Sequence, residues 1–309
     1  MLIDKFSIVV CTYNRAAYLS QTLQSIAGLD FSPKYFEVII VDNNSTDHTS
    51  EVCRSFIAQN PALTIRYFKE EQQGISAARN RGVREAEGYW IVFMDDDETV
   101  TPDFLQALDD FTEAYPAAEL ISERVEPVYE IPPPDWFSPY TLRLITGAYN
   151  KGNKIKTVGQ KDYPGTGHAS FQRYLFLQHG QFNTDLGRKG NSLMGAEDKD
   201  FFLRLIHNDV QCYYVPKAVI YHHIPAEKLT DDFFQGITSA IGKSERIRTL
   251  SISKTTYYKR LFSEAVKWGA SLALFVYYWL RGQSVKGKKL IEFRRNVSRG
   301  LFDKSTQGE

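Results

Sequence analysis

Cysteine is scarce in this sequence, and its spacing fits no metal site or disulfide framework. Cys11, Cys53 and Cys212 are the three cysteines among 309 residues. Zinc sites and disulfide-bonded secreted domains use closely spaced or paired cysteines, a pattern that this chain does not have. Unpaired thiols are typical of a reducing compartment, so we expect a cytoplasmic protein.

Net charge is zero, and we expect no amino-terminal targeting signal. The 37 basic and 37 acidic residues balance, so there is no overall positive field to attract a nucleic acid, and we expect no nucleic-acid partner. Residues 6–10 already have the apolar character of a strand, without the charged and then apolar segments of a signal peptide. The length and the hydrophobic content of 43% indicate a globular protein with one large or two modest domains.

Two glycine-rich nucleotide-binding motifs are also absent. No G-x-G-x-x-G follows the first apolar run, and no G-x-x-x-x-G-K-[ST] occurs in the chain. These motifs bring backbone N–H groups close to phosphates in dinucleotide-binding folds and P-loop proteins. Their absence disfavours both classes.

The first half of the chain alternates short apolar runs with helical patterns. Continuous apolar runs predict strands that are buried on both faces, and their alternation with helices predicts a mainly parallel sheet. We expect strands at Ser7–Thr12, Glu37–Val41, Thr64–Phe68 and Tyr89–Met94, and helices near Ala16–Ile26, Thr49–Gln59 and Ser76–Glu87. Because ligands bind at the carboxyl ends of such strands, the polar segments after the first, second and fourth strands should converge on one edge.

Three consecutive aspartates end the fourth apolar run. Asp95, Asp96 and Asp97 are followed by Glu98, and carboxylates packed this closely repel one another unless a cation compensates. In an extended chain Asp95 and Asp97 point to the same side and Asp96 points away. Such a pair suits Mg²⁺ or Mn²⁺ bound together with substrate phosphates. The alternative is an acidic turn before a helix that begins near Pro102.

Two further segments stand out between residues 125 and 205. Residues 125–167 are rich in proline and aromatic residues and predict a long, partly irregular excursion, which in a compact domain is usually functional. Residues 195–205 place Glu197 and Asp198 just before an apolar-periodic run. This pattern predicts a helix with carboxylates in its first turn.

Together these segments resemble the family 2 glycosyltransferases, which have the GT-A fold. The resemblance runs from Ser7 to about His223, and its blocks are residues 7–15, 38–47, 74–82, 93–97 and 195–198. Each block is weak to moderate by itself, but their order and spacing together are specific. The resemblance implies an α/β protein with a mixed, mainly parallel sheet flanked by helices. It also implies inverting transfer of a sugar from a nucleotide-diphosphate donor, expected to be a UDP-sugar, to a hydroxyl of a glycan or lipid-linked glycan.

The resemblance assigns a donor side to the site. The implied donor-binding residues are Thr12, Tyr13, Asn14, Arg15, Asp42, Arg79, Asp95 and Asp96. Within this set Tyr13 matches a residue that lies against the nucleobase, Asp42 one that hydrogen-bonds it, and Arg79 one near the diphosphate. Alternatives stay open, since Tyr13 could simply pack, Asp42 could cap a turn, and Arg79 could belong to a solvated helix face.

The resemblance also assigns a divalent metal and an acceptor side. Asp97 and Asp95 match the metal-binding motif, and His222 is a further candidate ligand that could equally be structural. The implied catalytic base is Asp198, and the implied acceptor-binding residues are Glu197, Gly167 and His168. This agrees with the chemistry, because a leaving diphosphate needs a cation and a poorly nucleophilic hydroxyl needs a base. Glu197 and Asp198 could instead serve only the helix dipole.

Beyond the resemblance the sequence predicts a helical carboxyl-terminal extension. We expect a catalytic domain at 1–228, with a nucleotide-sugar half of about 1–125 and an acceptor half of about 126–228, and an extension at 229–309. The apolar run Trp268–Leu280 is shorter than the roughly 20 residues of a membrane span and has basic flanks. It predicts an interfacial helix beside anionic lipid, with contact through residues 261–300. The alternatives are a core helix and a homo-oligomer interface.

The sequence therefore predicts an enzyme at the inner face of the cell membrane that builds a surface polysaccharide or glycolipid. Two rivals remain. A sugar-nucleotide-binding protein without activity could share the fold, although the acidic residues argue against it. A nucleotidyltransferase that makes the activated sugar would need a glycine- and lysine-rich loop after the first strand, which residues 11–15 lack.

Overall fold

The computed structural model describes residues 5–160, 162–190 and 192–304 and divides the chain into two compact units. The first unit comprises Met1–Val128, Ala148–Thr184 and Glu197–His223, and the second comprises Tyr129–Gly147, Asp185–Ala196 and Ile224–Glu309. Residues 129–147 and 185–196, expected in the acceptor half, thus belong to the second unit. A functional division at residue 228 stays a prediction.

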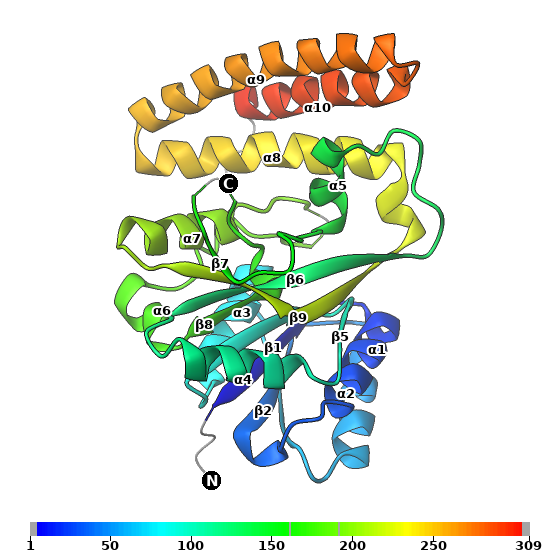
Figure 1. Ribbon diagram of the computed structural model, residues 1–309. Helices are drawn as coiled ribbons and strands as arrows, with labels where there is room; N and C mark the ends of the chain where they lie inside the picture. The colour runs from blue at the N-terminus through cyan, green and yellow to red at the C-terminus, as the bar shows by residue number, and fades with distance from the viewer. Residues whose placement is uncertain (1–4, 161, 191, 305–309) are drawn as a thin grey trace. The chain divides into compact units, whose positions relative to one another are not determined.

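The first unit is built on a mixed sheet that has nine strands in the described part of the chain (Figure 1). The strands are β1 (Phe6–Thr12), β2 (Phe36–Asp42), β3 (Thr64–Lys69), β4 (Trp90–Asp95), β5 (Glu98–Val100), β6 (Leu120–Tyr129), β7 (Lys156–Val158), β8 (Ala169–Gln172) and β9 (Cys212–Ile224). Their order is β3-β2-β1-β4-β8-β6-β9-β5, with β7 paired to β9. The first four are mutually parallel, and β8 is antiparallel to β4. The predicted mixed, mainly parallel α/β fold is confirmed.

Helices follow the strands as the apolar periodicity predicts. They are α1 (Ala16–Ala27), α2 (Thr49–Gln59), α3 (Ile75–Glu85), α4 (Phe104–Ala114), α6 (Tyr174–His179) and α7 (Glu197–His207), with short turns η1 (Pro33–Tyr35) and η2 (Thr166–His168). Every residue of β1 and β2 is buried, so both faces of the sheet are covered as expected. Gly82 lets α3 approach β1 closely, because a Cβ at this position would overlap the Val9 side chain.

The strand order creates a switch point between β1 and β4. The chain proceeds from β1 to β2 and β3 on one side and then returns to β4 on the other. In the register, Cys11 pairs with Asp95 and Thr12 pairs with Asp42, so these strands end at the same level. The segments that follow β1, β2 and β4 therefore share one sheet edge, which is where open α/β sheets bind ligands.

The acidic segment itself departs from the expected geometry. Asp95 is the last residue of β4, but Asp96 and Asp97 form the turn that leads into β5. The expectation of an extended chain with Asp95 and Asp97 on one side is wrong, because the chain reverses here to pair β5 with β9. The alternation of side chains along a strand does not apply within a turn.

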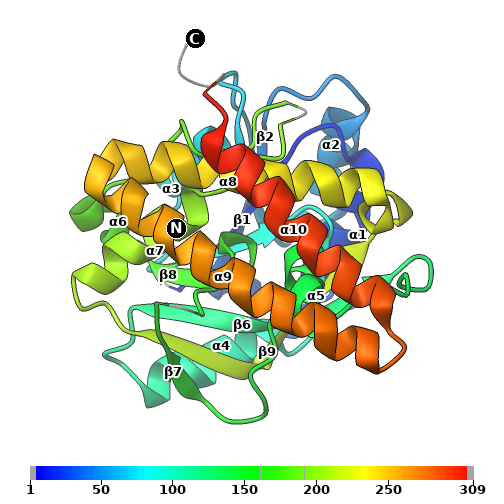
Figure 2. The ribbon, with the colours of Figure 1, turned by 90° about the horizontal axis from the view of Figure 1, so that it is seen from above.

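The second unit is helical. It contains α5 (Pro139–Thr146), η3 (Ala226–Leu229), α8 (Asp231–Ile252), α9 (Lys254–Leu280) and α10 (Ser284–Phe302). The last three helices pack on one another, with α9 and α10 side by side (Figure 2). An apolar cluster that includes Trp136, Ile224 and Phe234 joins the segment around α5 to α8. The predicted helical extension is confirmed. No described helix combines the length and the apolar character needed to cross a bilayer.

Candidate active site

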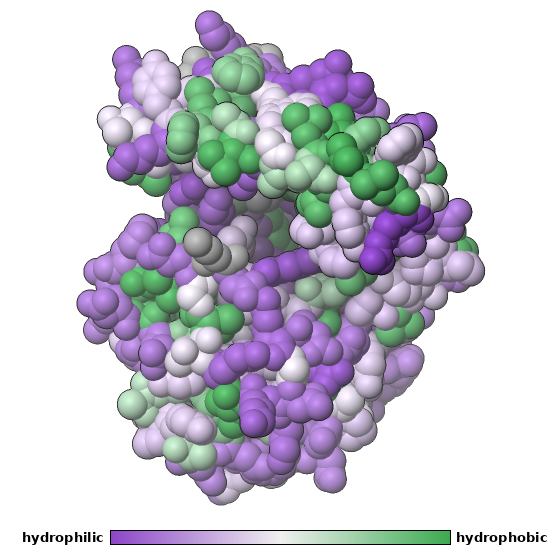
Figure 3. All heavy atoms as spheres, turned by 45° about the horizontal axis from the view of Figure 1, so that its top comes forward, coloured by the Kyte–Doolittle hydropathy of each residue, from purple (hydrophilic) through white to green (hydrophobic). Residues whose placement is uncertain are grey.

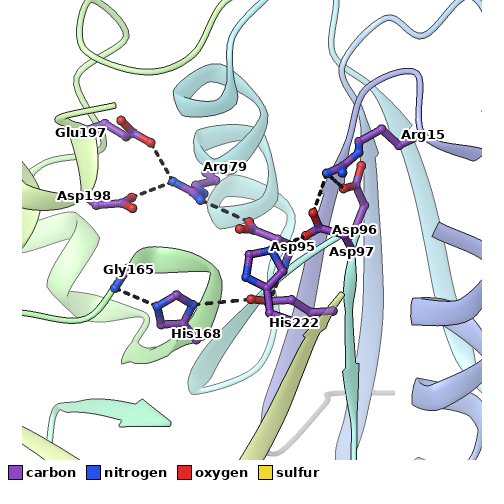
Figure 4. A network of polar contacts seen from close by, with 11 residues as sticks. Arg15, Arg79, Asp95, Asp96, Asp97, Gly165, His168, Glu197, Asp198 and His222 are labelled. Carbon is purple, nitrogen blue, oxygen red and sulfur yellow. Dashed lines mark hydrogen bonds and ion pairs between the residues drawn. The ribbon is translucent and has the colours of Figure 1, made fainter. Parts of the chain in front are cut away.

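Arg15 holds the acidic turn from the β1 side. Its Nη1 lies 3.0 Å from Oδ1 of Asp96 and 2.9 Å from Oδ2 of Asp97 (Figure 4). Asn14 adopts a left-handed backbone conformation (φ 54°), which asparagine tolerates better than most residues, and its side chain accepts a hydrogen bond from the Thr46 N–H at 2.7 Å. This bend directs Arg15 across the switch point. Asp96 and Asp97 therefore share a single guanidinium.

Burial makes negative charge unfavourable in this cluster even beside Arg15. Burial raises the pKa of Asp96 to about 6, against the opposing effect of Arg15 and with help from the neighbouring Asp97. Burial, reinforced by Asp95, also raises the pKa of Glu98 well above its ordinary value. Glu98 is fully buried, and its Oε2 accepts a hydrogen bond from the Asp95 N–H at 2.9 Å. Desolvated carboxylates in such a group favour an additional cation.

Arg79 connects the strand end to α7. This α3 residue is buried, and its Nη1 donates to Oδ1 of Asp198 at 2.7 Å and to Oε1 of Glu197 at 3.1 Å. Its Nη2 donates to Oδ1 of Asp95 at 3.3 Å. Figure 4 shows the guanidinium between the two acidic groups. The alternative that Arg79 lies on a solvated helix face is wrong, because α3 turns this side chain into the site.

Asp198 is an ionised carboxylate in the first turn of α7. Burial by itself would raise the pKa of Asp198, but the Arg79 guanidinium and hydrogen bonds from Thr166 outweigh burial and keep the pKa below its ordinary value. The predicted helix with acids in its first turn is confirmed, since Glu197, Asp198 and Asp200 all lie there. At neutral pH Asp198 is therefore a proton acceptor.

A short turn, η2, lies directly against Asp95. A Cβ on Gly167 would come within 2.5 Å of the Asp95 carboxylate, so only glycine fits there without displacing that side chain. The His168 ring accepts a hydrogen bond from the Gly165 N–H at 3.1 Å through Nε2, while Nδ1 lies 3.5 Å from Oε1 of Glu98. Gly167 and His168, two of the three residues predicted on the acceptor side, thus lie against the acidic cluster itself, and acceptor binding by them stays a prediction.

The residues of this cluster fit a divalent cation. β9 pairs His222 with Glu98, and Nε2 of His222 lies 3.3 Å from Oδ1 of Asp97. Carboxylate oxygens with one imidazole form a donor set that suits Mn²⁺ or Mg²⁺. Among the described residues, no three acidic, histidine or cysteine side chains form a ready-made metal cage. Such ions usually bind through one or two carboxylates and complete their coordination with substrate phosphates.

The predicted nucleobase side lies at the ends of β1 and β2. Asp42 is buried, and its two oxygens accept hydrogen bonds from the Ser45 N–H at 2.8 Å and from the Tyr67 hydroxyl at 2.7 Å. The turn role considered for Asp42 is thus present, and base binding stays a prediction. Thr12 is buried at the end of β1, and Tyr13 after it is partly exposed.

Three residues of this network had no role in the sequence analysis. Tyr67 lies on the edge strand β3, and its partner Asp42 is distant in sequence, so no local pattern reveals the contact. Thr166 begins η2, within a stretch that the sequence predicted to be partly irregular, and it hydrogen-bonds Asp198. Glu98 did carry a signal, because it directly follows three aspartates, but its burial depends on β5 pairing with β9.

Comparisons with known proteins agree with this geometry. The family described as glycosyl transferase family 2 matches residues 7–176, which is more than half of the chain. A curated relative from Haloferax volcanii, named glucosyl-dolichyl phosphate glucuronosyltransferase, is 26% identical over 83% of this chain and 83% of its own length. The poly(ribitol-phosphate) β-N-acetylglucosaminyltransferase TarS of Staphylococcus aureus is 32% identical over 33% of this chain. That alignment covers only 18% of TarS.

Solved structures show the same fold. TarS 1–349 in complex with UDP-GlcNAc superposes with a TM-score of 0.56 at 19% identity, over 94% of this chain and 91% of that one. The mannosyltransferase PcManGT of Pyrobaculum calidifontis, in complex with GDP-Man and Mn²⁺, gives a TM-score of 0.62 at 20% identity, over 97% and 88%. From its sequence, its sheet and the residues gathered at the switch point, the chain belongs to glycosyl transferase family 2 and is a glycosyltransferase with the GT-A fold.

Proposed function

We propose that this protein is an inverting glycosyltransferase that uses a nucleotide-diphosphate sugar, expected to be a UDP-sugar, and a hydroxyl of a glycan or lipid-linked glycan. One observation carries the proposal: Arg79 hydrogen-bonds both Asp198 and Asp95. The Arg79 guanidinium therefore separates Asp198, which can accept a proton, from Asp95, which is suited to bind a metal–diphosphate complex. A single displacement needs both groups in one site.

Asp198 acts as the base. Its carboxylate is held ionised by Arg79, so it can take the proton of the acceptor hydroxyl as that hydroxyl attacks the anomeric carbon. The bond from that carbon to the diphosphate breaks in the same step, which inverts the anomeric centre. Glu197, Gly167 and His168 are assigned to the acceptor side of the same site.

The strand ends hold the donor. We assign donor binding to Thr12, Tyr13, Asn14, Arg15, Asp42, Arg79, Asp95 and Asp96. Asp97, Asp95 and His222 would hold the divalent metal, which when bound stabilises negative charge on the departing diphosphate. Arg15 and Arg79 are permanently charged and lie beside these carboxylates, so they keep the donor side electrostatically balanced.

The named activities of relatives support a lipid-linked or cell-envelope acceptor. The Haloferax volcanii relative is named for a dolichyl-phosphate-linked substrate, and TarS is named for poly(ribitol-phosphate). A lipid-linked acceptor is held at a membrane by its lipid chain. We therefore place the enzyme in the cytoplasm, at the inner face of the cell membrane.

The proposal is tested by calorimetry of UDP and GDP binding to the full chain, with Mn²⁺ and with EDTA. We expect tighter UDP binding with Mn²⁺, and we expect Asp97→Asn to remove that gain. Asp103→Asn, which neutralises an exposed carboxylate outside the site, is the matched control and should retain the gain. Equal affinity with Mn²⁺ and EDTA would contradict the metal assignment.

A second measurement separates the rival functions. With Mn²⁺ and a UDP-sugar, a transferase should release UDP by slow hydrolysis and faster with an acceptor. A protein that only binds sugar nucleotides would release none. A nucleotidyltransferase would instead release pyrophosphate from UTP and a sugar 1-phosphate, and this result would overturn the proposed reaction.

A further inference from the structure

Helix α9 exposes a continuous apolar stripe. Exposed residues recur every three or four positions along it, the spacing of one helix face. They are Tyr258, Phe262, Val266, Gly269, Ala273, Val276 and Leu280. The stripe extends for about 33 Å at the rise of an α-helix. Figure 3 shows apolar side chains gathered on the surface of this helical unit, in the upper part of the view. Soluble monomers rarely expose so large an apolar surface, which marks it as an interaction surface.

The charges around this stripe are of one sign. In the described stretch 252–304 the exposed charged side chains are all basic. They are Lys254, Lys259, Lys267, Arg281, Lys288, Arg295, Arg299 and Lys304. The exposed charge of α9, of α10 and of the residues next to them is therefore positive throughout this stretch.

The acidic residues of this stretch are turned toward the helices. Glu264 is buried and lies 2.9 Å from Arg260 and 3.0 Å from Arg294. Glu292 pairs with Lys289 at 3.2 Å, and Asp303 lies 2.9 Å from Lys243. Internal pairing thus leaves the surplus of positive charge facing outward.

Aromatic and basic side chains also meet where the three helices pack together. A surface hollow of about 720 Å³ between α8, α9 and α10 is lined by Lys243, Trp268, Arg295, Arg299 and Phe302, and also by Asp303, which pairs with Lys243 and leaves the two arginines as its other cations. Trp268 donates its indole N–H to Ser298 at 2.9 Å, which fixes the ring at the wall of the hollow. An aromatic wall with several cations suits an anionic headgroup, with its phosphate at the arginines and its glycerol and chains against the rings.

We propose that the outer surface of α9 and α10 docks on an anionic phospholipid bilayer, with the apolar stripe of α9 entering the interface and the exposed lysines and arginines binding lipid phosphates. Apolar residues with basic borders and aromatic side chains near the helix end are the features of interfacial helices. A second copy of the chain is a poorer occupant. In a two-fold dimer this surface would face itself, which would bring the same positive charges together.

The test is sedimentation of the full chain with vesicles of phosphatidylcholine, with and without phosphatidylglycerol, at low and high salt. We expect binding to the anionic vesicles that weakens with salt. Phe262→Gln/Leu280→Gln should bind roughly 100-fold more weakly, because two apolar side chains that would enter the bilayer are lost. Its matched control is Tyr89→Gln/Leu177→Gln in the first unit. Phe262 and Leu280 are 73% and 72% exposed, and Tyr89 and Leu177 are 72% and 85% exposed.

A second pair of variants tests the charges. Lys288→Gln/Arg295→Gln/Arg299→Gln should bind at least roughly tenfold more weakly and with less dependence on salt. The control Lys34→Gln/Lys69→Gln/Lys217→Gln removes three exposed lysines from the first unit and should bind like the unmodified chain.

Three results would overturn the docking proposal. The full chain could ignore anionic vesicles, or the apolar variant could bind them as well as its control. Sedimentation velocity could also show a dimer that Phe262→Gln/Leu280→Gln dissociates without any change in vesicle binding, which would make the stripe a contact between copies. The assay needs neither donor nor acceptor, so its failure is distinct from a failure of the proposed catalytic function.

Discussion

At the scale of single residues, two arginines organise the site, of which Arg79 is buried and Arg15 is partly exposed. Arg15 binds the two aspartates of the β4–β5 turn, and Arg79 binds Asp95 together with the two acids of α7. Each guanidinium presents several donors in a fixed plane, so one side chain can hold carboxylates from different elements. The pKa of Asp198 depends directly on this arrangement.

The first prediction concerns Asp198→Asn. Asparagine keeps the shape of the side chain but cannot take a proton, so kcat and kcat/KM should fall together by about 10²–10⁴-fold. UDP affinity with Mn²⁺ should change little, because the donor is assigned to the strand ends. Steady-state kinetics and calorimetry measure the two quantities.

The neighbouring Glu197→Gln is the comparison for this variant. Glu197 also binds Arg79 but is not the assigned base, so its effect on kcat should be smaller. Normal turnover by Asp198→Asn would rule out Asp198 as the base. An equal loss of UDP affinity would move Asp198 to the donor side.

At the scale of elements, glycines decide how closely two helices approach. Gly242 in α8 and Gly300 in α10 lie at the crossing of these helices, where the Cα of each is 2.8 Å from the position that a Cβ on the other would take. A Cβ on Gly300 would also overlap the carbonyl oxygen of Ser239. Backbone atoms cannot move aside as the end of a flexible side chain can.

The second prediction follows from this crossing. Gly300→Ala should destabilise the helical unit by about 1–3 kcal/mol, the usual cost of overpacking. Gly269→Ala is the matched control, because nothing lies within 4 Å of a Cβ there and alanine should instead stabilise α9 by up to about 1 kcal/mol. Urea unfolding of both variants gives the comparison. Equal free energies of unfolding for the two variants would show that α8 and α10 can move apart with little loss of stability.

At the scale of the whole molecule, a buried acid links stability to pH. Glu123 in β6 is fully buried, and burial raises its pKa to about 8 even though the Ser170 hydroxyl donates to it. The folded state therefore keeps a proton that the unfolded chain releases near its ordinary pKa of 4.5. Below that pKa both states are protonated, and as the pH rises toward 8 the folded state progressively loses stability.

The third prediction is that Glu123→Gln flattens this pH dependence. Each pH unit in the window costs at most about 1.4 kcal/mol from this group, and glutamine has no proton to release. The melting temperature of the unmodified chain should fall from about pH 5 to pH 8 by more than that of the variant. Glu71→Gln, which changes an exposed acid, should leave the slope unaltered. If the melting temperatures of Glu123→Gln and of the unmodified chain fell equally with pH, the pKa of Glu123 would not be raised, which would mean that water or a cation reaches its carboxylate.

The sequence determined the elements and their chemistry, because these depend on local pattern. Apolar runs predicted β1, β2 and β4, and helical periodicity predicted α2 with the same bounds as in the structure. Acidic residues before an apolar run predicted the start of α7. Parallel pairing of such strands also places the ends of β1, β2 and β4 together. The family follows from the same segments.

Only the tertiary structure decided how these side chains meet. Arg79 and Asp198 are distant in the sequence, and nothing local requires α3 and α7 to face each other. The turn at Asp96 and Asp97 depends on β5 finding β9, a pairing between remote segments. The outward stripe of α9 likewise exists because α8 and α10 cover the opposite face, including Glu264. Local pattern specifies what each segment can form, whereas contacts between distant segments decide which side chains share a site and which face the solvent.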